Sequence, residues 1–210
     1  MNDKTVITIG RQFGSGGHEI GVKLAERMGV KCYDKELLEL AAKNSGLAEE
    51  IFTRQDEKPS SSLLYSLVMD TYSFGYSDSY GEMPINQRVF LAQFEAIKKL
   101  AQQESCVIVG RCADYALEGN INATSVFISS PMESRIKRIM ERCNIDEKKA
   151  EALINKTDKK RASYYDYYSD KKWGLAKSYQ LCLDSDAVGI DGAIDLIISF
   201  VEMKEKNLNK

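Results

Sequence analysis

A glycine-rich turn near the amino end is the part of the chain best suited to hold an anion. The run GRQFGSGG, residues 10–17, lies between a β-branched segment, residues 5–9, and an amphipathic pattern that starts near Ile20. A strand, a glycine-rich turn and a helix in this order direct backbone N–H groups and a helix N-terminus toward one point, which attracts phosphate. Glycine is needed because the backbone must approach the ligand closely and adopt φ > 0. We expect this turn to bind a nucleotide or another phosphorylated molecule; the alternative is a turn without a ligand.

The turn satisfies neither of two common phosphate-binding motifs. The P-loop pattern G-x-x-x-x-G-K-[ST], aligned on residues 14–16, needs lysine and then Ser or Thr, but the chain has Gly17 and His18. That lysine would hold the β- and γ-phosphates, and the hydroxyl would ligate Mg²⁺. The dinucleotide pattern G-x-G-x-x-G fails at Glu19, although Asp34 lies at about the right distance for a ribose-binding acid. A nicotinamide oxidoreductase is therefore the least favoured reading.

Composition and charge limit the classes of partner. The chain has 210 residues, 43% hydrophobic and 29% charged, which suits one core and a single domain over residues 1–210. Its net charge of -2 provides no basic field, so we expect neither nucleic acid nor membrane as a partner. No apolar run approaches the ~20 residues that span a bilayer, and the amino end has no signal-peptide pattern. We expect a cytoplasmic protein, and its oligomeric state stays open.

Cysteine and histidine are too few and too scattered for a protein-held metal. The 5 cysteines form no C-x-x-C pair, and the chain has 1 histidine, His18. We therefore expect no zinc site, no disulfide framework and no resident metal. A Ser-His-Asp triad would have to run through the glycine turn itself.

Strand and helix patterns alternate along the chain, which predicts a parallel sheet with helices on both faces. The strand-like runs are residues 5–9, 31–33, 106–109, 125–129 and 179–183. We expect helices to start near Ile20, at Asp34 (running to about Ser45), near Gln87, after a Ser130 cap with Pro131 in the first helical position, at Asp146, and near Asp191.

Ligands of such folds lie beyond the carboxyl ends of the strands. Polar or charged residues stand at each of those predicted ends: Gly10-Arg11, Asp34, Gly110-Arg111, Ser129-Ser130 and Asp184-Ser185. We therefore expect one ligand-binding rim, which includes the glycine turn.

Arg111 is the best single candidate on this rim, because an arginine that follows a buried strand needs an anionic partner. Asp34 and Asp114 are candidates for a Mg²⁺ outer shell or for a ribose or base contact. The structural alternatives are a helix cap for Asp34 and an ion pair with Arg111 for Asp114. Four tyrosines, at 164, 165, 167 and 168, could stack a base, but packing is the more common role of such clusters.

Two segments differ from the rest of the chain. Residues 47–86 mix glycine, serine and tyrosine, which favours a mobile insertion. Residues 135–172 are rich in positive charge and read as a lid-like segment. Each arginine there either lies on a solvated helix face or converges with the others on phosphates, where guanidinium groups match oxygen geometry. Two sets share a helical face by spacing: Arg135, Arg138 and Arg142, and Asp158 with Arg161.

Four runs of the sequence resemble the cytidylate kinase-like family: ITIGRQFGSGGHEIG, VIVGRCADYAL, VFISSPMESRIKRI and TDKKRASYYDYY. The resemblance extends from near residue 5 to near residue 200. It implies a three-layer P-loop kinase fold with a five-stranded parallel sheet, an acceptor-binding insertion (about 47–86) and a lid (135–172). It also implies transfer of the γ-phosphoryl group of ATP, with Mg²⁺, to a nucleoside monophosphate, with CMP or dCMP favoured.

The resemblance implies roles for single residues. Arg111 would contact the acceptor and transferred phosphates, Asp34 would close the second strand, and Asp114 would stand near the place of a family aspartate that Cys112 replaces. The lid would bind the acceptor's sugar and phosphate through Asp158 and Arg161. The donor would be held by the loop and by residues that border its adenine, namely Gly14, Ser15, Gly16, Gly17, His18, Asp184 and Ser185.

The missing lysine removes one cation beside the transferring group, and one such interaction supplies ~3 kcal/mol of transition-state stabilisation. If the protein is a kinase, we expect Arg11 or Lys23 to replace it, assisted by lid arginines such as Arg138. Two other functions stay open: a nucleotide-binding regulator or pseudokinase, and a kinase for another small acceptor.

Overall fold

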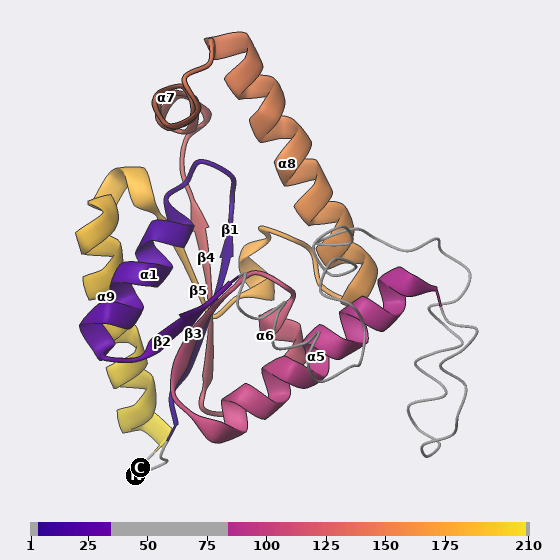
Figure 1. The fold of residues 1–210 in the computed structure, drawn as a ribbon. Coiled ribbons are helices and arrows are strands. Elements are labelled where there is room, and N and C mark those ends of the chain that lie inside the picture. The colour runs from indigo at the N-terminus through magenta and orange to yellow at the C-terminus, as the bar shows by residue number, and fades with distance from the viewer. Residues whose placement is uncertain (1–3, 35–83, 209–210) are drawn as a thin grey trace.

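The computed structural model describes residues 4–34 and 84–208. Within them, five parallel strands form one sheet in the order β2-β3-β1-β4-β5 (Figure 1). The strands are β1 (Val6–Arg11), β2 (Lys31–Tyr33), β3 (Cys106–Val109), β4 (Ala123–Ser129) and β5 (Leu181–Asp184). All five predicted strands are confirmed, with β1 running two residues further than expected and β5 starting two residues later.

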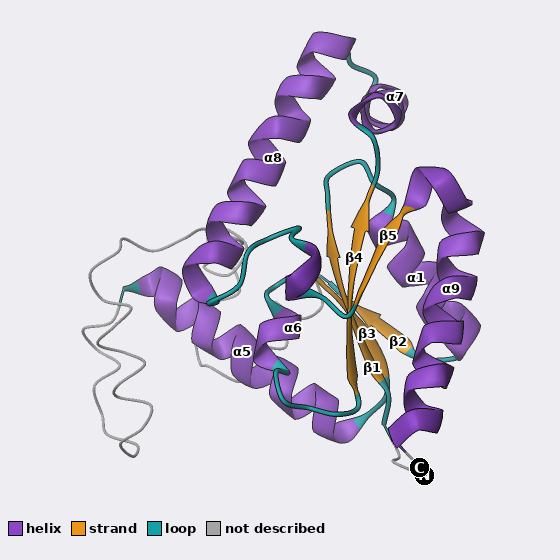
Figure 2. Cartoon of the chain, turned by 180° about the vertical axis from the view of Figure 1, so that it is seen from behind, coloured by secondary structure: helices purple, strands orange, loops and turns teal. Residues whose placement is uncertain are grey.

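Helices cover both faces of the sheet, so the predicted three layers are confirmed (Figures 1 and 2). Ile7 and Ile9 of β1 pack toward α1 and α9, whereas Val6 packs toward α5 and α6, as the two-residue period of a strand requires. The helices are α1 (Gly17–Met28), α5 (Ile85–Gln103), α6 (Ala113–Ala116), α7 (Met132–Cys143), α8 (Glu147–Tyr168) and α9 (Ser185–Leu208), with a short 3-10 turn at Ala176–Ser178.

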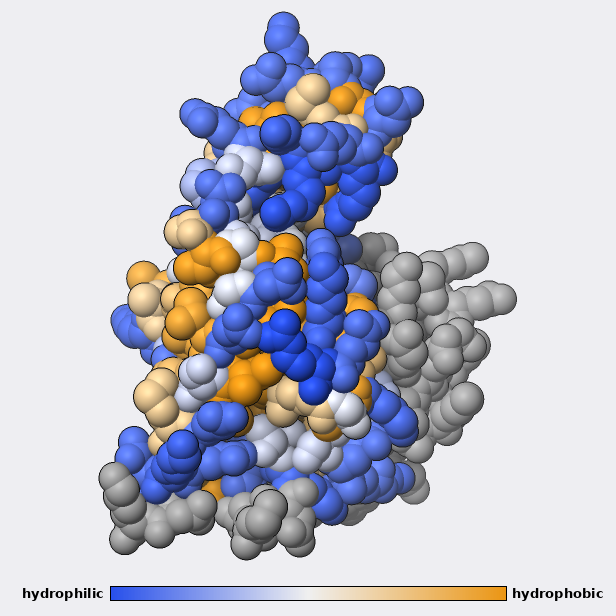
Figure 3. Space-filling model, turned by 90° about the vertical axis from the view of Figure 1, so that its left-hand side faces the viewer, coloured by the Kyte–Doolittle hydropathy of each residue, from blue (hydrophilic) through white to orange (hydrophobic). Residues whose placement is uncertain are grey.

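Helices α7 and α8 form an arm that leaves the carboxyl end of β4 and returns toward α5 (Figure 1). The side chain of Asp146 accepts a hydrogen bond from the Lys149 amide at 2.9 Å, which confirms the predicted helix start. The two helices pack through a small core of Ile139, Ala150 and Ile154. In Figure 3 the upper part of the molecule, where the arm lies, is mainly hydrophilic.

One helix start differs from the prediction. The residue that caps α7 is Pro131 rather than Ser130, because Ser130 stays buried and donates its amide to Gln12 Oε1 at 3.0 Å. The closing helix predicted from about Asp191 is confirmed as the part of α9 that follows a kink at Gly189, with φ 69, and a short helical stretch from Ser185 precedes that kink. The predicted helix after Asp34 and nearly all of the 47–86 insertion lie outside the described residues. No described helix is both long and apolar enough to span a membrane.

Candidate active site

The glycine loop, residues 12–17, presents backbone donors at the start of α1. It turns at Gly14 and Gly16, with φ values of 83 and 79. Within residues 4–34 and 84–208, the amides of Gly14, Gly16 and His18 make no hydrogen bond, and no side chain caps the helix. Three N–H groups are therefore available to one anion, at the end of a helix whose dipole favours negative charge.

Ser185 and Asp184 lie behind this loop. The buried Ser185 Oγ lies 2.5 Å from the carbonyl oxygen of Ser15 and 3.1 Å from that of Ser129. Asp184 is exposed and accepts a hydrogen bond from the Asp186 amide at 2.9 Å. In this structure Ser185 supports the loop; the contact of both residues with a donor adenine stays a prediction.

The arm binds the loop from the other side through Arg135, Arg138 and Asp158. Arg138 donates to the Gly14 carbonyl at 2.6 Å, and Arg135 donates to the Phe13 carbonyl at 3.4 Å. The Asp158 carboxylate accepts from the Phe13 amide at 2.7 Å and from Arg135 at 2.5 Å. Asp158 was expected at an acceptor sugar, but here it lies against the glycine loop, because its position on α8 brings it to the Phe13 amide and to Arg135 at once. Its contact with an acceptor stays a prediction.

Phe13 is a contact of the arm that the sequence did not single out, whereas Arg135 was named there among the arginines of one helical face. The guanidinium carbons of Arg142 and Arg161 lie 5.0 and 5.6 Å from the centre of the Phe13 ring, within cation–π range. A large aromatic residue inside a glycine-rich loop was the available signal for this role.

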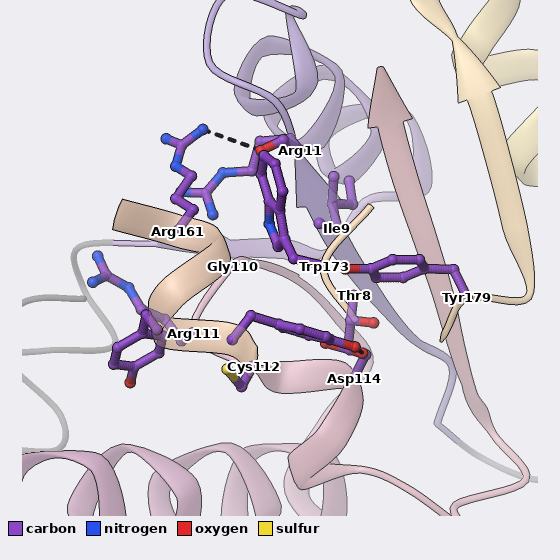
Figure 4. A pocket seen from close by; sticks show the side chains of 13 residues that line it. Thr8, Ile9, Arg11, Gly110, Arg111, Cys112, Asp114, Arg161, Trp173 and Tyr179 are labelled. Atoms are coloured by element: carbon purple, nitrogen blue, oxygen red, sulfur yellow. Dashed lines mark hydrogen bonds between the residues drawn. The ribbon is translucent and has the colours of Figure 1, made fainter. Parts of the chain in front are cut away.

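A pocket opens at the carboxyl ends of β1 and β3, next to the glycine loop (Figure 4). Three arginines from distant segments line it: Arg11 at the end of β1, Arg111 after β3, and Arg161 on α8. Arg161 donates to the Arg11 carbonyl at 3.1 Å, the dashed line in Figure 4. Arg11 is 9% exposed and Arg111 5%. The sequence placed these residues on one rim, and the structure brings them into one pocket.

Arg111 is held in an unusual backbone conformation. Gly110, Arg111 and Cys112 have φ values of 81, 62 and 52, three left-handed residues in a row. Such a conformation costs roughly 1–2 kcal/mol for a residue other than glycine. Strain of this kind persists where the surrounding structure requires one position of a side chain. Burial lowers the pKa of Arg111 and the Asp34 carboxylate opposes that shift, so the guanidinium stays charged.

Asp34 connects Arg111 with the first turn of α1, next to the glycine loop. One carboxylate oxygen lies 3.4 Å from Arg111 Nη2, and the other lies 3.4 Å from His18 Nε2 in the first turn of α1. The structure therefore unites three residues that the sequence listed separately. Among residues 4–34 and 84–208, no three His, Cys, Asp or Glu side chains form a metal-binding group.

Asp114 lies at the pocket wall, away from Arg111. The structural alternative, an ion pair with Arg111, is wrong, because Arg111 pairs with Asp34 and Asp114 accepts a hydrogen bond from the Tyr165 hydroxyl at 2.6 Å. Burial raises the pKa of Asp114, and burial together with the Asp114 charge raises the pKa of Tyr165. This carboxyl–phenol pair gives the pocket a polar wall.

The tyrosines of α8 mainly pack, as the structural alternative held. Tyr168 stacks on Phe90 with ring centres 4.0 Å apart, and Tyr164 and Tyr165 belong to the same buried cluster. Tyr164 and Tyr165 also line the pocket.

Of the two cations expected to replace the missing lysine, only Arg11 reaches the pocket. Lys23 does not line the pocket, pairs with Glu19 at 2.8 Å and is 46% exposed.

The sequence profile of the cytidylate kinase-like family matches residues 6–187. The chain belongs to this family. A search of curated proteins gives no match. The crystal structure of an uncharacterized protein from Eubacterium ventriosum is 33% identical, with a TM-score of 0.71 over 95% of this chain and 99% of that one.

This member of the cytidylate kinase-like family has the P-loop kinase fold. A shikimate kinase from Bacteroides thetaiotaomicron is 14% identical, with a TM-score of 0.53 over 94% of this chain and 98% of that one. A gluconokinase from Sinorhizobium meliloti is 12% identical, with a TM-score of 0.56 over 100% and 98%. At this identity both show the fold alone. Family and fold together support phosphoryl transfer as the general chemistry.

Proposed function

We propose that this protein transfers the γ-phosphoryl group of ATP to a nucleoside monophosphate, with CMP or dCMP as the favoured acceptor. The observation that carries the proposal is the convergence of Arg11, Arg111 and Arg161 on one pocket beside the glycine loop. This convergence from distant segments concentrates positive charge at the pocket. Phosphate groups provide the negative charge that suits it.

The proposed reaction needs positioning and charge more than proton transfer. An oxygen of the acceptor phosphate bonds to the γ-phosphorus, while the bond from that phosphorus to the β–γ bridging oxygen breaks. The electron pair leaves with ADP, so the products are ADP and a nucleoside diphosphate. An acceptor phosphate is largely ionised at neutral pH and needs no general base. The arginines offset the charge of the transferring group and orient both phosphates.

The loop residues suit ATP, and Asp34 suits a role beside Mg²⁺. The amides of Gly14, Gly16 and His18 match the oxygens of a polyphosphate. When bound, Mg²⁺ would offset charge on the β- and γ-phosphates. Mg²⁺ in such sites takes one or two carboxylates and leaves other positions to phosphates and water. Asp34 is a partly exposed carboxylate 3.4 Å from His18 in the first turn of α1, so it would hold the ion directly or through water.

A kinase for a hydroxylated acceptor is the second candidate, and Asp34 favours it. A hydroxyl nucleophile needs a base, and the Asp34 carboxylate beside His18 Nε2, at 3.4 Å, could accept its proton. The similarity of fold to a shikimate kinase and a gluconokinase makes shikimate and gluconate suitable test acceptors.

An acceptor panel with ATP and Mg²⁺, read out as ADP release, tests the proposal. CMP and dCMP should exceed AMP, UMP, shikimate and gluconate. Turnover with shikimate or gluconate alone would favour the second candidate. ATP binding without turnover on any acceptor would favour a nucleotide-binding regulator.

Two α8 variants serve as a matched pair in this assay. Arg161→Met should lower turnover about a hundredfold, because it removes one phosphate-facing cation. Lys159→Met removes a cation from an exposed position of the same helix and should leave turnover unchanged.

A further inference from the structure

The glycine loop departs from the P-loop pattern at positions 11, 17 and 18, and the departures at 11 and 17 are reciprocal. With Gly16 as the second glycine of G-x-x-x-x-G-K, the first glycine falls on position 11 and the lysine on position 17. The chain has arginine at 11 and glycine at 17. Position 11 thus carries a cationic residue where the pattern has glycine, and position 17 carries glycine where the pattern has the cationic lysine.

The structure gives a physical reason for this exchange. A Cβ atom added to Gly17 would lie 2.5 Å from the Cβ of Arg11 and 3.2 Å from its Cγ, closer than packed carbon atoms approach. Arg11 cannot move away from this contact, because its backbone pairs in the sheet with Ile128 of β4. Gly17 cannot yield, because it begins α1 and its own Cβ would also lie 3.3 Å from Ile128. Only one of the two positions can carry a side chain.

The Arg11 side chain extends from this contact into the pocket. A Cβ on Gly110 would collide with the Arg11 guanidinium, so that group lies directly over Gly110. Its charge lowers the pKa of Arg111, which places the two cations within electrostatic reach of each other. The Arg161 bond to the Arg11 carbonyl, at 3.1 Å, fixes the backbone from which the side chain starts.

We propose that Arg11 is the cation that the P-loop lysine would supply, moved to the first-glycine position, and that Gly17 is the residue that makes room for it. This inference rests on the proposed kinase function and names one residue that offsets charge on the transferring phosphoryl group. From the end of β1, Arg11 reaches that group from the acceptor side of the loop, whereas a lysine at 17 would reach it from α1.

The test is to reverse the exchange in the full-length protein. Arg11→Gly removes the cation, and Gly17→Lys adds a lysine whose Cβ would clash with Arg11. The double variant restores the pattern G-x-x-x-x-G-K. Glycine rather than alanine is required at 11, because the contact involves Cβ itself. Lys23→Ala, which removes an exposed cation of α1, is the control.

Three measurements are made on each protein: the Kd of Mg-ATP by calorimetry, the thermal unfolding midpoint, and turnover with CMP. Arg11→Gly should weaken Mg-ATP binding at least about tenfold and slow turnover about a hundredfold. Gly17→Lys should lower the unfolding midpoint. The double variant should recover both the midpoint and at least about tenfold in Kd over Arg11→Gly, while Lys23→Ala matches the parent.

The outcomes separate this inference from the proposed function. A parent that binds no Mg-ATP contradicts both. A parent that binds Mg-ATP, with an Arg11→Gly variant that binds it equally well, overturns the role of Arg11 and leaves the kinase proposal intact. A Gly17→Lys variant as stable as the parent overturns the steric part, because positions 11 and 17 would then not exclude each other.

Discussion

The carboxylate of Asp158 accepts a hydrogen bond from the Phe13 amide at 2.7 Å, although 145 residues separate the two. The same carboxylate pairs with Arg135, and both side chains are largely buried, at 15% and 7% exposed. The arm of α7 and α8 is thereby joined to the backbone of the glycine loop. The position of the arm and the shape of the loop are therefore coupled.

Substituting Asp158 should lower the free energy of unfolding of the protein. Asp158→Ala leaves the buried Arg135 without its anion, and breaking such a pair costs about 3 kcal/mol or more. Urea unfolding measures the change. Lys149→Ala breaks an exposed pair with Asp146, 74% and 54% exposed, and should cost at most about 1 kcal/mol. Equal losses in the two variants would show that the Asp158 pair is not effectively buried.

Alanine substitutions at Gly16 and Gly29 distinguish the cost of backbone strain from the cost of steric crowding. Both have positive φ, 79 and 67, but a Cβ at Gly16 would lie 2.7 Å from Ile190 Cδ1, whereas one at Gly29 meets nothing within 4 Å. Gly29→Ala should therefore cost about 1 kcal/mol and leave Mg-ATP affinity unchanged. Gly16→Ala should cost more and also weaken Mg-ATP, as unfolding and calorimetry on the same samples would show. A Gly16→Ala protein with parental affinity would contradict the assignment of this loop.

Arg111 should be intolerant of lysine. Arg111→Lys keeps the charge but loses the planar fork that can hold two phosphates at once. We expect kcat to fall at least about tenfold with little change in the unfolding midpoint, since the Asp34 carboxylate keeps a cationic partner. Initial rates over a range of acceptor concentrations test this. Parental kcat in the variant would mean that charge alone suffices at this position.

Asp114 should make stability depend on pH. Burial raises its folded-state pKa above the ordinary value of 3.8, so the folded protein holds the proton more tightly than the unfolded chain does. Its contribution is fully present below that ordinary value and is lost as pH rises through the folded-state pKa.

Asp114→Asn keeps an oxygen for the Tyr165 hydroxyl but cannot ionise. Relative to this variant, the parent should lose free energy of unfolding as pH rises above about 4, in denaturant titrations at a series of pH values. Parallel pH profiles for the two proteins would contradict the burial of this carboxyl.

Local pattern predicted most of the scaffold. The β-branched run before the glycine loop, the apolar run Cys106–Val109 and the Asp146 cap each leave a signal in neighbouring residues, and each is confirmed. The helical stretch from Ser185 to the kink at Gly189 was not predicted, because it is too short to show a helical period. Helix α6 spans only Ala113–Ala116, too short to show a period, and the sequence did not predict it.

The sequence predicted that Arg11 and Arg111 lie on one rim, because both follow the carboxyl ends of parallel strands. It did not predict the residues that they contact, because those contacts depend on how distant elements pack. The Tyr165 bond to Asp114 and the Asp158 bond to Phe13 each join α8 to a segment far away in sequence. No local spacing encodes such pairs. Likewise, the reason for glycine at 17 is visible only when β1 and α1 are placed side by side.

Titration of the full-length protein with Mg-ATP in a calorimeter tests the central claim most directly, because it asks whether the loop binds a triphosphate without a lysine. The account predicts a saturable heat for the parent that Gly16→Ala diminishes and Gly29→Ala leaves unchanged. A parent that releases no heat at millimolar Mg-ATP, or one whose binding is the same in all three proteins, would contradict it.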